Sequence, residues 1–277
     1  RGASFRFQPS IDAISEVQVV TNQFSAEYGR ASGGRVNLGT RSGTNKFRGR
    51  AYYYFRDESL NANTWNNNRR GYSRPAFQNH DPGFTFGGPI VKNRLFFFTA
   101  YEYDNIKEDT IVDAWVLSGS ANPQFALPAP NDPTAPIVNL NPSGGFPGVQ
   151  VGHYITPVDT PAKKHIFSQR VDWNLNGAHN FTFNYQLGRS NDLRAFSGTN
   201  RIADSLIGRI RNTDAFNLTH NYTVSSKLVN QVRFQYSTLD PSSAQSAGAT
   251  SPAVLVTFTP PGESSQTQVF GSTTSSS

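Results

Sequence analysis

The sequence predicts an all-β fold of antiparallel strands that cross a lipid bilayer. Between residues 46 and 277 the strand-like segments alternate apolar and polar side chains. They run for about 9–12 residues, longer than the roughly five or six typical of soluble sheets. The connections are alternately short and long, so that all long loops fall on one side of the predicted sheet. Short turns on one rim and long loops on the other are the pattern of a transmembrane β-barrel.

Composition agrees with a chain whose apolar surface is concentrated in aromatic rings. Aromatic residues make up 13% of the 277 residues, whereas all hydrophobic residues together reach only 36%. There is no cysteine, which excludes disulfides, thiolate metal sites and cysteine nucleophiles. No apolar run reaches the length of about 18 residues that a transmembrane helix requires, so any membrane crossing is predicted to use strands.

The first 45 residues are predicted to form a separate small unit. Ala13–Thr21 and Gly34–Ser42 alternate apolar with polar residues, so we expect a strand in each. Between them, one or two helical turns around Ala26–Tyr28 end at glycines. Residues 1–45 therefore read as a small α+β unit, and residues 46–277 as the strands and loops of the barrel.

Two segments carry aromatic residues at consecutive positions. They are "AYYYFRD" (Ala51–Asp57) and "NRLFFFTAYEYD" (Asn93–Asp104). Because successive side chains of a strand point to opposite faces, rings occupy both faces, and the second face needs an apolar neighbour. We expect lipid to be that neighbour, with the rings near a membrane interface.

Four later segments each have one apolar and one polar face. The apolar faces carry Val171, Trp173 and Leu175; Phe181, Phe183, Tyr185 and Leu187; Phe216, Leu218 and Tyr222; and Val232, Phe234 and Tyr236. The predicted tight turns are Val91–Arg94, Asn176–Asn180 and Val224–Lys227. The predicted long loops are Ser59–Asp81, Asp104–Lys163, Arg189–Asn212 and everything after Asp240.

Two stretches then resemble a known family, the TonB-dependent outer-membrane receptors, and most closely its Oar-like group. Ser15–Asp57, "SEVQVVTNQFSAEYGRASGGRVNLGTRSGTNKFRGRAYYYFRD", resembles the end of the plug and the first barrel strand, and Phe86–Glu102, "FGGPIVKNRLFFFTAYE", continues the likeness. The resemblance covers about residues 10–110. It implies a barrel of about 22 strands around a plug, in the bacterial outer membrane. Residues 1–45 would be the C-terminal part of the plug domain, and residues 46–277 about seven N-terminal barrel strands.

The resemblance also implies a function. Such a receptor binds its substrate at extracellular loops and plug and passes it to the periplasm, energised by the TonB complex through an upstream segment. Outer-membrane lipid is the other expected partner, and neither a cofactor nor enzymatic activity is expected. The absence of methionine and the tail "GSTTSSS" favour an excised piece of a longer protein. So does the incomplete barrel, whose open edges hydrocarbon cannot satisfy.

Charged residues on both units form the first candidate site. Related receptors are thought to hold the plug through Arg and Glu contacts that face the lumen. Glu27 and Arg30 lie three residues apart, on one face of a helical turn. The candidate plug contacts are Glu27, Arg30, Arg35 and Arg41, and the candidate lumen partners are Arg48, Arg50, Arg170, Asp172 and Arg233. The alternative is that these charges merely hydrate a polar lumen.

Aromatic and basic residues of the loop Asn63–Tyr72 form the second candidate site. Trp65, Arg69, Arg70 and Tyr72 are candidate ligand contacts, because aromatic rings beside polar residues stack on sugars. The alternative is that these residues anchor the loop at the membrane interface or pack within it. The reading as ligand contacts supports an alternative function, a soluble secreted β-sandwich that binds glycan or another surface; detergent dependence separates it from a barrel. A polysaccharide-cleaving enzyme is a third class, but Asp104, Asp109 and Asp113 offer no pairing that the sequence supports.

Other functional signals are weak. The histidines His80, His153, His165, His179 and His220 have no metal-ligand spacing, so no metal or catalytic site is predicted. "GTRSGTNK" (Gly39–Lys46) departs from a phosphate-binding loop, and its glycines are expected to form the bend between the two units. The net charge is +6, but its basic residues are scattered, and no nucleic-acid partner is predicted.

Overall fold

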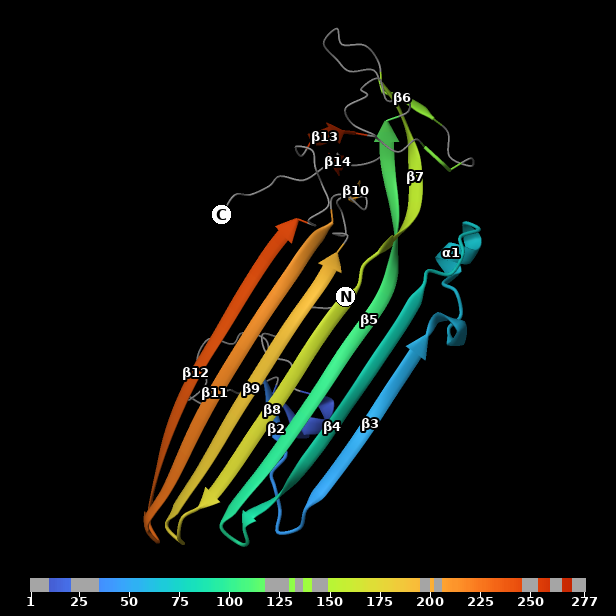
Figure 1. The fold of residues 1–277 in the computed structure, drawn as a ribbon. Helices are drawn as coiled ribbons and strands as arrows, with labels where there is room; N and C mark the ends of the chain where they lie inside the picture. Colours follow the sequence, from blue (N-terminus) through green and yellow to red (C-terminus); the bar gives the residue numbers. More distant parts are fainter. Residues whose placement is uncertain are drawn as a thin grey trace.

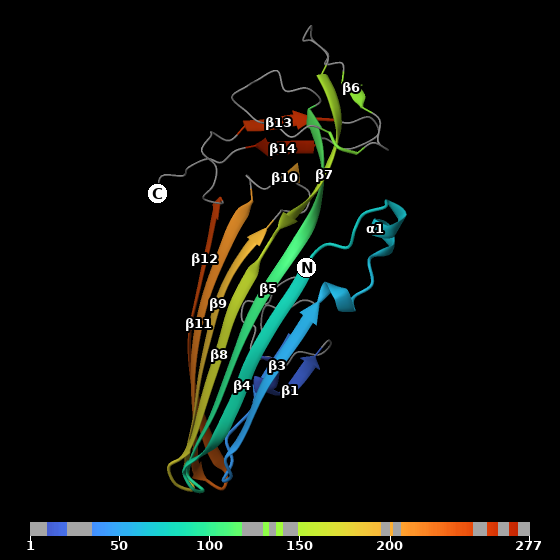
Figure 2. The same ribbon diagram turned by 45° about the vertical axis from the view of Figure 1, so that its right-hand side comes forward.

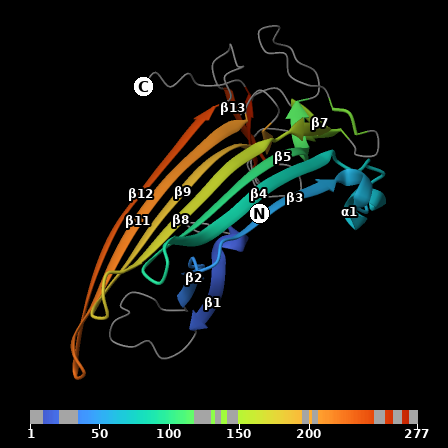
Figure 3. The ribbon, with the colours of Figure 1, turned by 60° about the horizontal axis from the view of Figure 1, so that its bottom comes forward.

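The main body of the protein is a single curved antiparallel sheet (Figures 1 and 3). The computed structural model describes residues 10–20, 35–117, 130–132, 137–140, 149–194, 200–201, 206–245, 254–259 and 266–270. Over these ranges nearly all regular structure is strand, which confirms the predicted all-β class. No helix within the described ranges is long and apolar enough to cross a membrane.

The sheet has nine strands, and seven of them follow the chain in an unbranched path, β12-β11-β9-β8-β5-β4-β3. Every pair on this path is antiparallel. The path therefore agrees with the predicted number of barrel strands. The seven strands are β3 (Arg48–Asp57), β4 (Phe77–Val91), β5 (Leu95–Leu117), β8 (Ala162–Asn174), β9 (His179–Arg194), β11 (Ile207–Ser225) and β12 (Leu228–Gln245).

Short turns and long connections lie at opposite ends of the sheet, as predicted. The β4–β5, β8–β9 and β11–β12 turns lie together at the lower end of Figure 1. In the first of them Asn93 has a φ of 62°, a left-handed conformation that asparagine tolerates better than most residues. Asn45 Nδ2 donates to Asn93 Oδ1 at 2.6 Å, and Asn93 N donates to Asn45 Oδ1 at 2.8 Å. This reciprocal pair joins the start of the sheet to its first turn.

At the long-loop end the strands extend beyond their predicted limits. The long loop predicted to begin at Asp104 is instead strand as far as Leu117, and β4 begins at Phe77. The distal half of β5 pairs with β7 (Val149–Asp159), which pairs with β6 (Val138–Leu140), and together they form an arm. Pro, Asn, Ser and Gly later in this segment favoured a loop, but pairing with β7 satisfies the backbone groups of β5 and buries Val112, Val116 and Val151.

The smaller elements complete the long-loop end. A short helical segment and a small separate sheet lie there (Figure 1). These elements are η2 (Glu58–Leu60), α1 (Trp65–Arg69), β10 (Asn200–Arg201), β13 (Val254–Phe258) and β14 (Gln266–Phe270).

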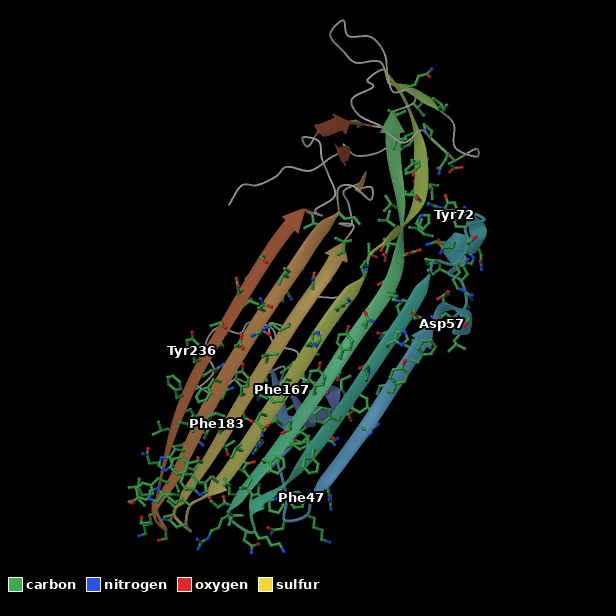
Figure 4. All side chains as sticks on the ribbon, in the orientation of Figure 1. Phe47, Asp57, Tyr72, Phe167, Phe183 and Tyr236 are labelled. Atoms are coloured by element: carbon green, nitrogen blue, oxygen red, sulfur yellow. The ribbon has the colours of Figure 1, made fainter. Side chains whose placement is uncertain are left out.

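The register separates the side chains of the sheet into an apolar outer face and a polar inner face. Phe183 lies opposite Leu218, which lies opposite Phe234. One residue along, Asn184, Asn217 and Gln235 form the corresponding row on the inner face. Figure 4 labels Phe167, Phe183 and Tyr236 on three strands of the outer face. Outer-face rings such as those of Phe234 (56% exposed) and Tyr236 (60%) have no protein layer over them.

The consecutive phenylalanines divide between these faces. Phe97 belongs to the outer face, where its ring centroid lies 5.5 Å from that of Phe86. Phe98 belongs to the inner face, opposite Arg170. Rings also fill the space above two glycines of β4: Tyr52 lies over Gly83, and Phe47 lies over Gly88. The paired glycines of "FGGPI" thus serve close ring packing.

The N-terminal unit lies against the inner side of the sheet (Figures 2 and 3). Its described part consists of η1 (Ile11–Ala13), β1 (Ile14–Val20) and β2 (Arg35–Thr40), and the two strands pair antiparallel. Both predicted strands are thereby confirmed. The helical turn predicted at Ala26–Tyr28 lies outside the described residues.

The linker after β2 approaches the sheet so closely that it requires glycine. A Cβ atom on Gly43 would collide with the backbone oxygen of Phe97 and would lie 2.9 Å from that of Gly88. We predict that Gly43→Ala lowers the free energy of unfolding of the full-length protein in detergent by about 1–3 kcal/mol, because backbone must shift. Gly177→Ala is the matched control, since nothing lies within 4 Å of its Cβ position. Equal denaturant midpoints for both variants would contradict the close approach.

Adjacent residues on β12 test the assignment of the two faces. We predict that Phe234→Arg, on the outer face, lowers stability in lipid vesicles by up to about 2–4 kcal/mol, the cost of arginine at a bilayer midplane. Gln235→Arg, on the inner face, should cost much less because that face is polar. Denaturant unfolding in vesicles measures both, and a larger cost for Gln235→Arg would reverse the faces.

Candidate functional site

The candidate site is the inner face of the sheet together with the N-terminal unit that lies on it. The predicted lumen partners all fall on this face by register. Arg48 and Arg50 alternate with outer-face residues along β3, Arg170 and Asp172 do so along β8, and Arg233 lies on β12 opposite Thr219. Within the described ranges, three sets of polar contacts join the N-terminal unit to the face.

The first contact is an ion pair between the N-terminal unit and β3. Arg50 Nη1 lies 3.0 Å from Asp12 Oδ1. Arg50 Nη2 also donates to the hydroxyl of Tyr54 at 2.8 Å, which orients the guanidinium. The Arg50 side chain is 56% exposed and that of Asp12 only 17%, so the pair lies at the boundary between protein and solvent.

The second contact converges on Glu102 of β5. Ser10 Oγ donates to Glu102 Oε2 at 2.7 Å, and the hydroxyl of Tyr52 donates to the same oxygen at 3.2 Å. Ser10 is 1% exposed. Hydrogen bonds to a charged carboxylate are stronger than those between neutral groups, so Glu102 anchors the start of the N-terminal unit.

The third contact surrounds Arg170 of β8. Its Nη1 donates to the carbonyl oxygen of Thr40 at 2.7 Å. Its Nε and Nη2 each lie 2.8 Å from a carboxylate oxygen of Asp172, a bidentate arrangement that fixes the guanidinium plane. Asp172 also accepts a hydrogen bond from Thr182 Oγ1 at 3.0 Å, and Thr40 Oγ1 donates to Asn184 Oδ1 at 3.2 Å. The end of β2 is thus held by β8 and β9.

Two of the four predicted plug contacts, Arg35 and Arg41, lie in the described part of the chain. Arg41 bonds within its own unit, where Nε donates to the carbonyl oxygen of Ile14 at 3.2 Å. Arg35 is the first residue of β2, opposite Val20. Glu27 and Arg30 lie outside the described residues.

Sequence reasoning missed the residues that the N-terminal unit does use. These are Ser10, Asp12, Thr40, Glu102 and Asn184. Four of them have uncharged or short side chains that no sequence motif marks. Glu102 carried a signal that could have been used, because it is a carboxylate within an aromatic strand, where burial requires partners.

A second polar cluster joins the β3–β4 loop to the arm. Arg70 Nη1 lies 3.0 Å from Asp113 Oδ2, and His153 Nδ1 lies 2.7 Å from Asp113 Oδ1. The ring of His153 packs on Trp115, with centroids 3.9 Å apart. Burial and the nearby Asp113 carboxylate raise the pKa of Tyr72. Two of the predicted loop residues, Arg70 and Tyr72, therefore lie in this cluster.

The other two predicted loop residues form a pair on α1. The Arg69 guanidinium lies over the Trp65 ring, 5.3 Å from its centroid, and Trp65 is 69% exposed. Figure 4 shows Tyr72 next to this helix at the long-loop end. Within the described ranges, no group of three or more His, Cys, Asp or Glu side chains is arranged to hold a metal ion.

Comparison with known proteins gives two matches. The sequence matches the family described as "Outer membrane beta barrel domain" over residues 39–119 and 116–277. It is also 33% identical over 96 residues to the TonB-dependent transporter Oar of Myxococcus xanthus. That alignment covers 33% of this chain and 9% of the transporter, so the chain corresponds to a small part of its relative. No solved structure matches the chain.

The base of the arm provides a pH-dependent test. Asp109 of β5 lies opposite Asp159 of β7, and burial together with that carboxylate raises the pKa of Asp109. The pKa of Asp109 in the folded state exceeds the unfolded value of about 3.9. Ionisation of Asp109 therefore lowers the free energy of unfolding, and this destabilisation is absent below the unfolded pKa and complete above the folded one. We predict that Asp109→Asn stabilises β5–β7 pairing at neutral pH by about 0.2–1 kcal/mol and has no effect in acid.

Amide hydrogen exchange along β5 and β7 measures this effect, with mutant and wild type compared at each pH. Asp240→Asn is the matched control, because Asp240 lies opposite Asn212 and has no carboxylate across the strand pair. A stabilisation by Asp109→Asn that persists at low pH would rule out charge repulsion as its cause.

Proposed function

The chain belongs to the outer membrane beta barrel domain family, and from this premise we propose that it is part of a TonB-dependent transporter of the Oar-like kind. The observation that carries the proposal is the N-terminal unit on the polar inner face, held there by three polar contacts. A plug inside a barrel lumen requires this arrangement. The similarity to the transporter Oar supports the same function.

The membrane location follows from the family and explains the outer face. The chain resides in the bacterial outer membrane, which excludes the soluble secreted β-sandwich considered as the alternative. A sandwich would also need a second sheet over the rings of Phe183, Phe216 and Phe234, and the described strands place none there. Hydrocarbon covers these rings instead.

The open edges of the sheet support a larger barrel. β3 and β12 each have a partner on only one side within the described path. Unpaired backbone groups cost several kcal/mol each in hydrocarbon, so further strands must complete the sheet. We propose that residues 46–277 supply the first strands of a barrel of about 22 strands, with the turns toward the periplasm and the long loops outside.

Residues 1–45 are, in this proposal, the end of the plug domain. The contacts that its described residues make with the sheet include one ion pair, and an ion pair at such a boundary is worth only about 0–1 kcal/mol. Such contacts hold the plug at rest yet break at small cost. A pull on an upstream segment by the TonB complex would release the pair Asp12–Arg50 and the carbonyl of Thr40 from Arg170, which opens a path along the inner face.

The substrate would first meet the long-loop end. The exposed Trp65 ring and its neighbour Arg69 are the proposed contacts there, with Arg70 and Tyr72 supporting the loop through the arm. Ring and guanidinium surfaces favour a substrate with flat or sugar-like groups. The protein would bind and pass on this substrate without chemical change, so it is proposed to be no enzyme.

A charge exchange at the first contact tests the plug assignment. In the full-length protein, Asp12→Arg and Arg50→Asp each place like charges at the two positions that now form an ion pair, and the double variant restores an opposite pair. We predict that each single variant loosens the plug and raises the permeability of the outer membrane to large solutes, whereas the double variant recovers wild-type behaviour. The coupling energy should be about 0.5–1 kcal/mol.

Uptake of a large antibiotic by cells that express each variant provides the measurement. Lys107→Asp, at an exposed position of β5 on the outer face, controls for a change of charge alone. If the effects of the two substitutions on uptake were additive, with no recovery in the double variant, the assignment of residues 1–45 to a plug would be contradicted.

A further inference from the structure

The turn end of the sheet is basic and lacks carboxylates. The sequence ranges 41–51, 88–98, 173–182 and 221–232, which form the turns and the strand ends beside them, contain no Asp or Glu. Among the strands of the main path, Asp172 is the carboxylate nearest this end, and Arg170 already neutralises it. The side chains Lys46, Lys92, Arg94 and Lys227, here called the basic rim, are all exposed at this end.

A cluster of aromatic rings next to the basic rim indicates where the turn end of the sheet lies in the membrane. His179 and Tyr222 stack with centroids 4.2 Å apart, and Phe181 and His220 stack at the same distance. Trp173 lies 5.6 Å from Phe181 and extends the cluster to β8. The register places these residues on the outer face. Amphipathic rings prefer the interface between hydrocarbon and headgroups, so the basic rim lies at headgroup level.

Apolar side chains around the turns also indicate that the basic rim lies at the level of the lipid headgroups. Val91, Leu175, Val224 and Leu228 flank the three turns and are exposed, at 49%, 41%, 45% and 56%. Exposed aliphatic side chains beside lysines are typical of a surface in contact with lipid headgroups. The aliphatic groups lie in the membrane interface, and the ammonium groups reach the phosphates. The rim is therefore built for contact with lipid.

We propose that the basic rim binds the phosphate groups of anionic phospholipids in the periplasmic leaflet of the outer membrane. Each lysine ammonium and the guanidinium of Arg94 would donate hydrogen bonds to phosphate oxygens, and the described turns and strand ends that carry them contain no carboxylate that competes. At the opposite end of the same strands, basic residues are mixed with carboxylates such as Asp57, Glu108 and Asp109. This difference in charge between the two ends of the sheet would restrict the binding of anionic phospholipids to the periplasmic leaflet.

The experiment measures lipid preference in the full-length protein. The protein is folded into vesicles with equal amounts of phosphatidylglycerol and phosphatidylcholine and extracted in mild detergent, and the retained lipids are quantified by mass spectrometry. We expect the wild type to retain phosphatidylglycerol preferentially and Lys92→Gln/Lys227→Gln to lose this preference, by up to about fivefold for each lysine. High salt should weaken the wild-type preference, because ions screen exposed charges.

The matched control is Lys107→Gln/Lys163→Gln, two exposed lysines on the outer face at the long-loop end. This variant changes net charge equally and should keep the wild-type preference. Both lysines of the rim variant lie in solvent-exposed turns, and heat-dependent gel mobility verifies that each variant is folded. An unchanged preference in the rim variant, or an equal loss in the control, would overturn the proposal. Neither result bears on the plug contacts.

Discussion

The backbone hydrogen bonds of the long antiparallel ladder are the constraint on which the other features depend. In hydrocarbon no water can satisfy an N–H or C=O group, so every strand must pair along its whole membrane length. The pairing along the path from β3 to β12 meets this requirement for the strands between them, whereas β3 and β12 themselves are paired on one side only. Pairing also sets the register, and the register decides which side chains face lipid and which face the interior. Which side chains contact lipid and which contact the N-terminal unit follow from it.

The division into two faces explains a chain that has almost no conventional core. Few large side chains are fully buried, whereas outer-face rings such as Tyr53, Phe86 and Phe234 remain exposed. The apolar solvent completes the packing that a second sheet would give a soluble protein. The inner face does not contact lipid, and it carries the arginines and carboxylates that hold the N-terminal unit. Among the described residues these contacts include the ion pair Asp12–Arg50 and the hydrogen bonds of Ser10 and Thr40.

The two ends of the sheet differ as strongly as its faces. At the turn end, tight connections, an Asn45–Asn93 pair and a ring cluster hold the strands close together. At the long-loop end, strands continue beyond the apolar band and form an arm held by Asp113 and His153. Basic residues without carboxylates gather at the first end, and mixed charges at the second. The protein thus has a distinct chemistry for each leaflet.

The sequence by itself determined the faces of the main-path strands and the tight turns between them, because alternation and turn residues are local properties of the chain. It also placed Arg50 and Arg170 on the inner face, since periodicity alone sets the side of a strand. Only the tertiary structure decided their partners. Asp12, Thr40 and Glu102 are distant from them in sequence, and no local pattern reports which segment crosses which strand. The extension of β5 as far as Leu117 was equally hidden, because it depends on long-range pairing with β7, in which side chains such as Val116 and Val151 become buried.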